Sequence, residues 1–383
     1  MVRASVTSNA TTSTVKIPDS ALCANLTYRS ACLRNTRNTS LSQWVDKHAV
    51  KAFARRRSMA ELQIAVPATV AYARAGSEIS VSNSALVADT LSSLRLGARL
   101  IFKATHLSGG VMLVGNSSVT CLRSPCISPA QPNKGLTGNP KLGFSGTIAT
   151  TSIATTLDVM RSTCDYWLSH AYHGNGVEIA LYRGVRRGCM LESAIHPDPS
   201  AVGNIKFFCF DGVCPCAQVT TSQFHVSTGE ASGQVVEQAA KRMSRGYFSL
   251  PGWSAMKVYT GHKGLHRQLV DWRPPLFAPR LIEHAQVLSS GFSHVRVDFM
   301  FSVDGPVFNE LTFAPSACGE QFEPRKIDCL YAWLAWGNPP REAAPHEIET
   351  EQLRLLAVHE RSHKWVCHER KHKAGGGTAC YWT

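Results

Sequence analysis

Two acidic residues and an arginine in one predicted β-hairpin are the side chains of this sequence best placed for chemistry. Asp298 and Glu310 lie on opposite sides of an Asp304–Gly305 turn, and apolar residues alternate along both flanking segments. Such a hairpin places the two carboxylates on neighbouring strands, close enough to share one cation, with Arg296 beside them. A phosphate-handling enzyme needs these groups to hold magnesium against a nucleotide. The same alternation also fits an ordinary half-exposed hairpin, so other segments must decide between the two interpretations.

A lysine followed by a glycine turn forms a second candidate site. Lys103 ends the predicted strand 98–103, and Ser108, Gly109 and Gly110 form a turn that exposes backbone N–H groups. Lysine supplies a point charge for phosphate oxygens, and glycine lets the backbone approach an anion. The segment has neither the Walker A pattern nor the Gly-x-Gly-x-x-Gly spacing. A plain hairpin is the alternative interpretation.

Two further charged residues lie on predicted strands between these segments. Glu192 ends an apolar strand over 188–194, and Lys206 lies in the next strand, 204–210. Together they would suit an adenine and phosphate site. Charges at the ends of surface strands explain the same spacing.

Composition limits the class of protein and its partners. The chain has 383 residues, 44% of them apolar, and a net charge of +13, which suits an anionic partner such as a nucleotide, an acidic polysaccharide or nucleic acid. Aromatic residues do not interleave with the basic patches, so we expect no nucleic-acid partner. The sequence has no transmembrane segment and no secretory signal peptide, and we expect a cytoplasmic protein, with an organelle transit peptide over 1–16 as the alternative.

The thirteen cysteines are scattered without the spacing of a zinc ribbon or the density of a secreted scaffold. We therefore expect most of them to be buried, reduced thiols and none to bind metal.

A competing motif lies near the end of the sequence. His359–His363 fits the His-Glu-x-x-His pattern of zinc peptidases on a helix predicted over 347–365, and His368–His372 repeats the pattern. A short duplication in a basic tail explains both copies without catalysis, because no third ligand follows.

Strands and helices are intermixed without regular βαβ alternation, so the sequence predicts an α+β protein. Asp46 can cap a helix that begins at Lys47, and further helices are predicted over 151–172, 279–289 and 324–336.

The order of these motifs resembles the TupA-like ATP-grasp family over about 44–337. No single piece is diagnostic, but the ordered set is specific. The segments that carry the resemblance are Asp46–Lys51, Phe102–Gly110, Trp167–Leu168, Leu191–Glu192, Lys206–Gly212, Val295–Phe299 and Phe308–Pro315.

The resemblance implies two α+β lobes whose antiparallel sheets clasp ATP. The expected organisation is an irregular segment over 1–42, a first lobe over 43–187 with a loop insertion at about 115–147, a second lobe over 188–340 that contains the metal-binding hairpin, and a basic helix and tail over 341–383.

The resemblance also implies roles for individual residues. In the nucleotide site, Lys103 contacts phosphates, the turn covers them and Glu192 meets adenine or ribose; the site comprises Lys103, His106, Ser108, Gly109, Gly110, Glu192 and Lys206. Arg296 steadies phosphate or the tetrahedral intermediate and acts in catalysis with Lys103. Asp298, Glu310 and Thr312 are the expected magnesium ligands, although Thr312 replaces a more usual asparagine and Asn309 a more usual glycine.

The implied activity is an ATP- and Mg²⁺-dependent carboxylate–amine ligase that forms an acylphosphate and then an amide. The expected substrates are an amino acid or an acidic, uronic-acid-containing polymer of surface polysaccharide or peptide, with an amine as co-substrate. A polysaccharide-modifying transferase or kinase of the same fold is one alternative. A catalytically weak relative that binds an anionic polymer is the other.

Overall fold

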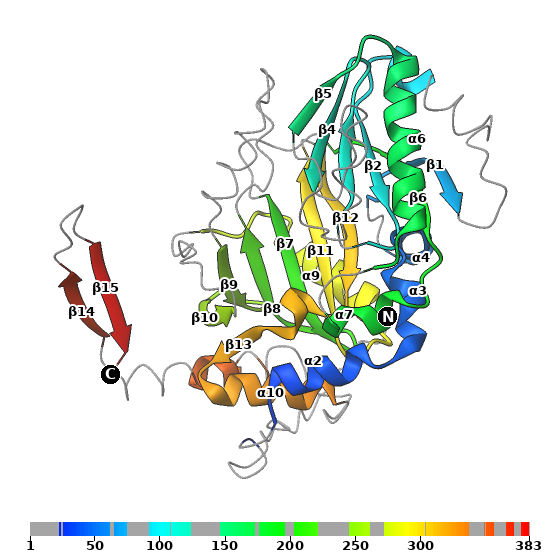
Figure 1. Ribbon diagram of the computed structural model, residues 1–383. Helices are drawn as coiled ribbons and strands as arrows, with labels where there is room; N and C mark the ends of the chain where they lie inside the picture. Colours follow the sequence, from blue (N-terminus) through cyan, green and yellow to red (C-terminus); the bar gives the residue numbers. More distant parts are fainter. Residues whose placement is uncertain are drawn as a thin grey trace, which may run out of the picture.

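The structure is a computed structural model in which side chains and backbone are described for most of the chain (Figure 1). It describes residues 23, 26–61, 65–74, 92–107, 109–123, 146–172, 176–195, 203–220, 245–260, 272–302, 304–336, 348, 350–355, 365–370 and 377–382.

The first sheet has six strands, and every neighbouring pair is antiparallel. In spatial order the strands are β1 (Thr69–Arg74), β6 (Gly188–Ser193), β2 (Leu100–Ala104), β3 (Val111–Val114), β4 (Ser118–Arg123) and β5 (Gly146–Ala149). Helix α6 (Ile153–Ser169) covers one face and buries Trp167 against Phe102, with ring centroids 5.0 Å apart. The opposite face carries Lys103 and Glu192.

The second sheet has seven strands that are again antiparallel to their neighbours. In spatial order they are β12 (Gly305–Thr312), β11 (Val295–Ser302), β7 (Asn204–Phe210), β8 (Val213–Thr220), β9 (Arg245–Ser249), β10 (Ala255–Thr260) and β13 (Glu320–Glu323). The described tail forms a separate hairpin of β14 (Trp365–Arg370) and β15 (Gly377–Trp382).

Helices cover both faces of the second sheet. Helix α9 (Ala278–Ser289) packs on the face that carries Phe207 and Phe299. On the other face, Tyr28 of α2 (Tyr28–Thr36) contacts Phe208, and Tyr331 of α10 (Arg325–Ala335) contacts Phe210. Further helical segments are η1 (Thr39–Leu41), α3 (Ser42–Val45), α4 (Lys47–Glu61), α7 (Gly176–Tyr182) and η3 (Pro315–Cys318), and residues 92–95, 348 and 350–355 are also helical.

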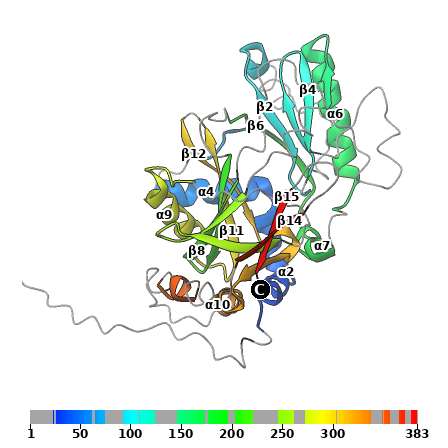
Figure 2. The ribbon, with the colours of Figure 1, turned by 90° about the vertical axis from the view of Figure 1, so that its left-hand side faces the viewer.

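Helix α4 connects the two sheets. Its first turn is capped by Asp46, whose Oδ1 accepts hydrogen bonds from the backbone N–H groups of His48 and Ala49 at 2.8 and 3.2 Å, as the sequence predicted. The Lys47 N–H donates to the carbonyl of Thr105 below the first sheet at 3.4 Å, while Phe53 lies in the core of the second. Figure 2 shows α4 beside the second sheet and beneath the first.

The cysteines differ from the expectation of reduced thiols. Nine of the described cysteines are disulfide-bonded, and Cys216 is the free, buried thiol of the described part of the chain. The scattered spacing misled the prediction because the disulfides join segments that are far apart in sequence and meet only in the folded chain. The described pairs are Cys23–Cys329, Cys32–Cys318, Cys164–Cys189 and Cys209–Cys214.

The structure changes several expected boundaries. Residues 28–41, expected to be irregular, form α2 and η1 because Thr27 and Ser30 cap α2 reciprocally. The loop expected over 115–147 begins with β4, which pairs with β3 and buries Val119. Strand β6 lies in the first sheet, so a division of the chain by sheets falls after Ser193 rather than after residue 187.

The described part of the tail confirms the first part of the helix predicted over 347–365: residues 348 and 350–355 are helical, whereas Trp365 begins β14. The first His-Glu-x-x-His copy, 359–363, lies outside the described residues, and His368, Glu369 and Arg370 of the second copy lie in β14. These three residues are extended, whereas zinc peptidases carry the motif on a helix. Among the described helices, none combines the length and the apolar character needed to cross a bilayer.

Candidate active site

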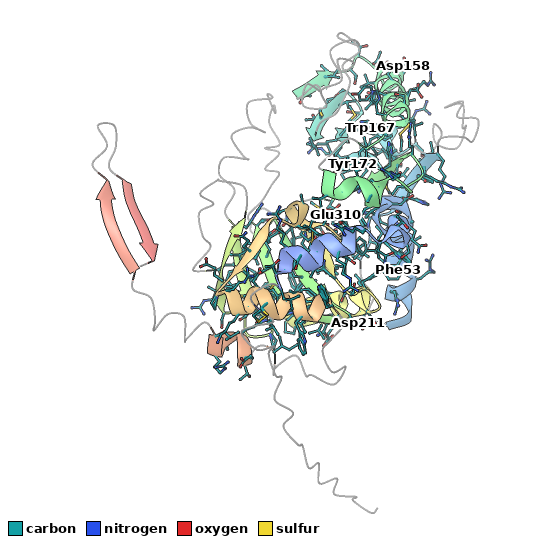
Figure 3. All side chains as sticks on the ribbon, turned by 60° about the horizontal axis from the view of Figure 1, so that its bottom comes forward. Phe53, Asp158, Trp167, Tyr172, Asp211 and Glu310 are labelled. Atoms are coloured by element: carbon teal, nitrogen blue, oxygen red, sulfur yellow. A yellow bond between two sulfur atoms is a disulfide. The ribbon has the colours of Figure 1, made fainter. Side chains whose placement is uncertain are left out.

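The predicted hairpin forms, and its two carboxylates lie directly opposite each other. Strands β11 and β12 pair antiparallel with Asp298 opposite Glu310, and β7 places Lys206 on the other side of Asp298. A row of alternating charge therefore crosses three adjacent strands. Figure 3 labels Glu310 in this sheet, and Trp167 and Tyr172 in the part of the chain around the first.

A β-bulge in β12 turns Glu310 toward this row. Asp298 pairs with Glu310, yet the next residue, Phe299, pairs with Phe308, which leaves Asn309 as the extra residue. Without the bulge, residues 308 and 310 would face the same side of the sheet. The bulge lets Phe308 enter the core while Glu310 stays half-buried beside Asp298.

Arg296 holds Asp298 through two hydrogen bonds. The guanidinium donates from Nε to Asp298 Oδ1 and from Nη2 to Oδ2, both at 2.7 Å, and Nη2 also donates to the Thr312 hydroxyl at 3.1 Å. Burial alone would lower the pKa of Arg296, but Asp298, Glu310 and Glu320 together raise it. Thr312, expected as a magnesium ligand, thus supports the arginine in this structure.

Lys206 completes the row as a second cation. Its Nζ lies 3.5 Å from Asp298 Oδ2. Burial, followed by the charge of Arg296, lowers the pKa of Lys206. Arg296 and Lys206 together balance the charges of Asp298 and Glu310.

A second charged cluster lies on the first sheet. Glu192 pairs with two lysines: its Oε1 lies 2.7 Å from Lys51 Nζ of α4, and its Oε2 contacts Lys103 Nζ of β2. Burial lowers the pKa of Lys51 to about 7, and the neighbouring Lys103 adds to this effect. Burial would raise the pKa of Glu192, but the two lysines lower it overall. Two lysines on one carboxylate leave a net positive charge, which suits a phosphate group.

In this structure, the described residues around the glycine turn make contacts within the protein. Both ring nitrogens of His106 bond within the protein: Nδ1 accepts from the Gly188 N–H at 3.3 Å, and Nε2 donates to the Trp167 carbonyl at 2.9 Å. His106 therefore anchors the turn. Gly110 has φ +68°, and a Cβ there would lie 3.0 Å from the Trp167 ring, so glycine is required. Gly109 lies beside it, and Ser108 lies outside the described residues.

Magnesium is the metal that the family resemblance implies, and the carboxylate row fits it by chemistry. Two opposed carboxylates suit Mg²⁺, which usually takes one or two protein carboxylates and completes its shell with water and substrate phosphate. No group of three or more His, Cys, Asp or Glu side chains suited to a metal occurs in the described part of the chain. Asp298 also gives both oxygens to Arg296, so a metal must compete with this guanidinium.

The fold is α+β, with two antiparallel sheets that each carry a charged cluster. The model of the TupA-like ATP-grasp family matches residues 273–332, the segment that contains α9, β11, β12 and β13. This match confirms the resemblance for the segment that carries the carboxylate row. A comparison with curated proteins gives no match.

Several solved structures are similar to the chain at low identity. D-cycloserine synthetase DcsG is 14% identical with a TM-score of 0.35, over 76% of this chain and 71% of its own. D-alanine–D-alanine ligase from Bacillus anthracis is 13% identical with a TM-score of 0.34, over 82% and 69%. A RiPP-associated ATP-grasp ligase from Chryseobacterium gregarium, in complex with ADP and a leader and core peptide, is 11% identical with a TM-score of 0.37, over 80% and 64%. Values this low do not support a comparison of individual residues.

Two buried groups of the site were not assigned from the sequence. Lys51 belongs to a segment that carries the family resemblance, but apart from its position in a predicted helix nothing in the sequence indicated a role for this residue in the site. Glu320 had no signal at all, because it lies outside every motif and reaches the site through β13.

Proposed function

We propose that this protein is an ATP- and Mg²⁺-dependent carboxylate–amine ligase that forms ADP and an amide. The observation that carries the proposal is the pair Asp298 and Glu310, opposed across β11 and β12 and bordered by Arg296, in the segment that matches the TupA-like ATP-grasp family. Carboxylates are poor electrophiles, and phosphorylation converts a carboxylate oxygen into a leaving group.

Each cluster would have its own task. Asp298 and Glu310 would hold Mg²⁺, which neutralises the charge of the transferring phosphate. Arg296 would then be placed to stabilise the oxyanion that develops at the substrate carboxylate. On the first sheet, Lys51 and Lys103 would bind nucleotide phosphates, with Glu192 orienting both ammonium groups.

The acceptor is proposed to be an amino acid or a uronate-containing polymer. The net charge of +13 supports an acidic substrate, because a basic surface raises the local concentration of anions. A transferase or kinase acting on the same polymer differs in its products: a ligase yields ADP, phosphate and an amide, whereas a kinase leaves phosphate on the acceptor. Analysis of the products with a panel of amino acids and uronates separates these reactions.

The test of the metal site is ATP turnover by Asp298→Asn and Glu310→Gln. We expect each variant to lose at least about 100-fold in Mg²⁺-dependent turnover, since even groups that only support metal ligands cost about 10- to 100-fold when removed. Asp304→Asn is the matched control because Asp304 is exposed at the turn of the same hairpin. Wild-type turnover by Asp298→Asn, with the fold intact by circular dichroism, would refute the assignment.

A further inference from the structure

Glu320 is a buried carboxylate that has no hydrogen-bond partner in the described part of the chain. It is the first residue of β13, its side chain is fully buried (0% exposed), and neither carboxylate oxygen makes a hydrogen bond. An isolated buried charge is costly and is normally paired. Because no part of the side chain reaches solvent, its partner has to come from within the protein.

Packing places Glu320 and Arg296 in the same part of the core. Phe322, two residues further along β13 and therefore on the same face as Glu320, lies with its ring centroid 5.7 Å from that of Phe208. Phe208 is in turn the cross-strand neighbour of Arg296. The charge of Glu320 also acts on the pKa values of Arg296, Tyr28 and Tyr247.

Two arginines, Arg296 and Arg245, share these surroundings. Arg296 is the one whose pKa the charge of Glu320 raises. The hydroxyl of Tyr28 bonds to His294 Nε2, the hydroxyl of Tyr247 accepts from Gln218 Nε2, and neither hydroxyl bonds to Glu320. The guanidinium of Arg296 bonds to Asp298, the carboxylate that a metal would need. Asp298 therefore has this arginine as its partner, while Glu320 has no hydrogen bond to a described residue.

We propose that Arg296 exchanges partners, leaving Asp298 for Glu320 when a divalent cation binds between Asp298 and Glu310. Glu320 is then a positioning residue: it receives the displaced guanidinium and lowers the cost of opening the metal site. The exchange explains why Asp298 is bonded by Arg296 and why Glu320 is buried without a hydrogen bond to a described residue. It rests on the metal site in the proposed function.

Metal affinity tests the exchange without turnover. Free Mn²⁺ is measured by electron paramagnetic resonance during titration of the full chain with a non-hydrolysable ATP analogue present. We expect Glu320→Gln to weaken Mn²⁺ binding about tenfold, which corresponds to about 1.4 kcal/mol. In an Arg296→Gln background the same substitution should not change the Mn²⁺ affinity, because no guanidinium then has to move to a new partner. Stability in urea without metal should not fall in Glu320→Gln, whereas the loss of a purely structural residue would lower it.

Three outcomes would count against the proposal. Unchanged Mn²⁺ affinity in Glu320→Gln, or an equal loss in the Arg296→Gln background, overturns the exchange and leaves the metal site standing. Unchanged affinity in Asp298→Asn overturns the metal site and the exchange together. If Glu320→Gln fails to fold, nuclear magnetic resonance of the unmodified protein provides the test. The side-chain N–H signal of Arg296 should shift when Mg²⁺ and the analogue are added, and an unchanged signal would overturn the exchange.

Discussion

Lys51 has the most unusual environment of any lysine in the site. Its ammonium group is fully buried and shares the single carboxylate of Glu192 with Lys103. Burial lowers its pKa to about 7, so at pH 8 the group is mostly neutral in the free protein. A bound phosphate would favour the charged form and raise this pKa.

Nucleotide binding should therefore take up protons at pH 8. Calorimetric titration with MgADP in two buffers of different ionisation enthalpy should reveal an uptake of up to about one proton, which disappears at pH 6, where Lys51 is already charged. Lys51→Met should abolish the buffer dependence. Equal binding heats in both buffers at pH 8 would mean that Lys51 does not meet the nucleotide.

The charged residues of the site differ in how far the sequence could predict them. The hairpin pattern predicted Asp298 and Glu310 on neighbouring strands, but the register set by the turn alone would place Asn309 opposite Asp298, and the bulge places Glu310 there instead. Lys51 and Glu320 could not be predicted, since their neighbours come from other elements and only packing brings them together. The hydroxyl of Thr312 was assigned to magnesium, and the hydrogen bond from Arg296 could not be foreseen from spacing.

The bulge in β12 is the element-scale feature that sets the register of the carboxylate row. Deletion of Asn309 would remove the extra residue, so Phe308 and Glu310 would become consecutive and would still face opposite sides of the sheet, next to Phe299 and Asp298. We therefore expect Mg²⁺-dependent ATP turnover to persist in the deletion variant, because both residues keep their cross-strand partners.

The control for this deletion is Asn309→Ala, which keeps the number of residues and the bulge. Urea denaturation should place it close to the wild type. A deletion variant that folded but lost turnover would contradict this expectation and would show that the orientation of Glu310 depends on the bulge itself.

Elements with strong local signals were predicted, and those that depend on distant contacts were not. The hairpin β11–β12 and the Asp46 cap of α4 are encoded by turn and capping residues close in sequence. Helix α2 has little amphipathic pattern, and it is fixed by Tyr28 and by disulfides to the far end of the chain. The bulge could not be predicted, because one extra residue within a strand leaves no distinctive pattern in the sequence.

At the scale of the whole molecule, two disulfides join the N-terminal helix region to the elements that follow the carboxylate row. Cys23–Cys329 and Cys32–Cys318 connect the same two segments. While one bond is intact, the other closes only a short additional loop. Such disulfides persist in oxidising compartments and are rare in the cytosol, which counts against the cytoplasmic location expected from the sequence.

Removal of these disulfides should be strongly non-additive. Cys32→Ala with Cys318→Ala should cost about 3 kcal/mol of unfolding free energy, as expected for a loop of about 20 residues. Removing both disulfides should cost more than the sum of the two separate losses, because the long loop then opens as well. Urea denaturation without reductant measures this, and strictly additive losses would contradict it.

Helix α4 has a consequence for how the two clusters affect each other. It carries Lys51 against Glu192 of the first sheet, and the segment after it bonds to β12, where the Phe308 N–H donates to the Ala65 carbonyl at 2.8 Å. A ligand that displaces Glu192 would release Lys51 of α4, the helix that precedes the residue bonded to β12. Any resulting change in the affinity of one cluster must appear in the other by the same factor, because thermodynamic coupling between two sites is reciprocal.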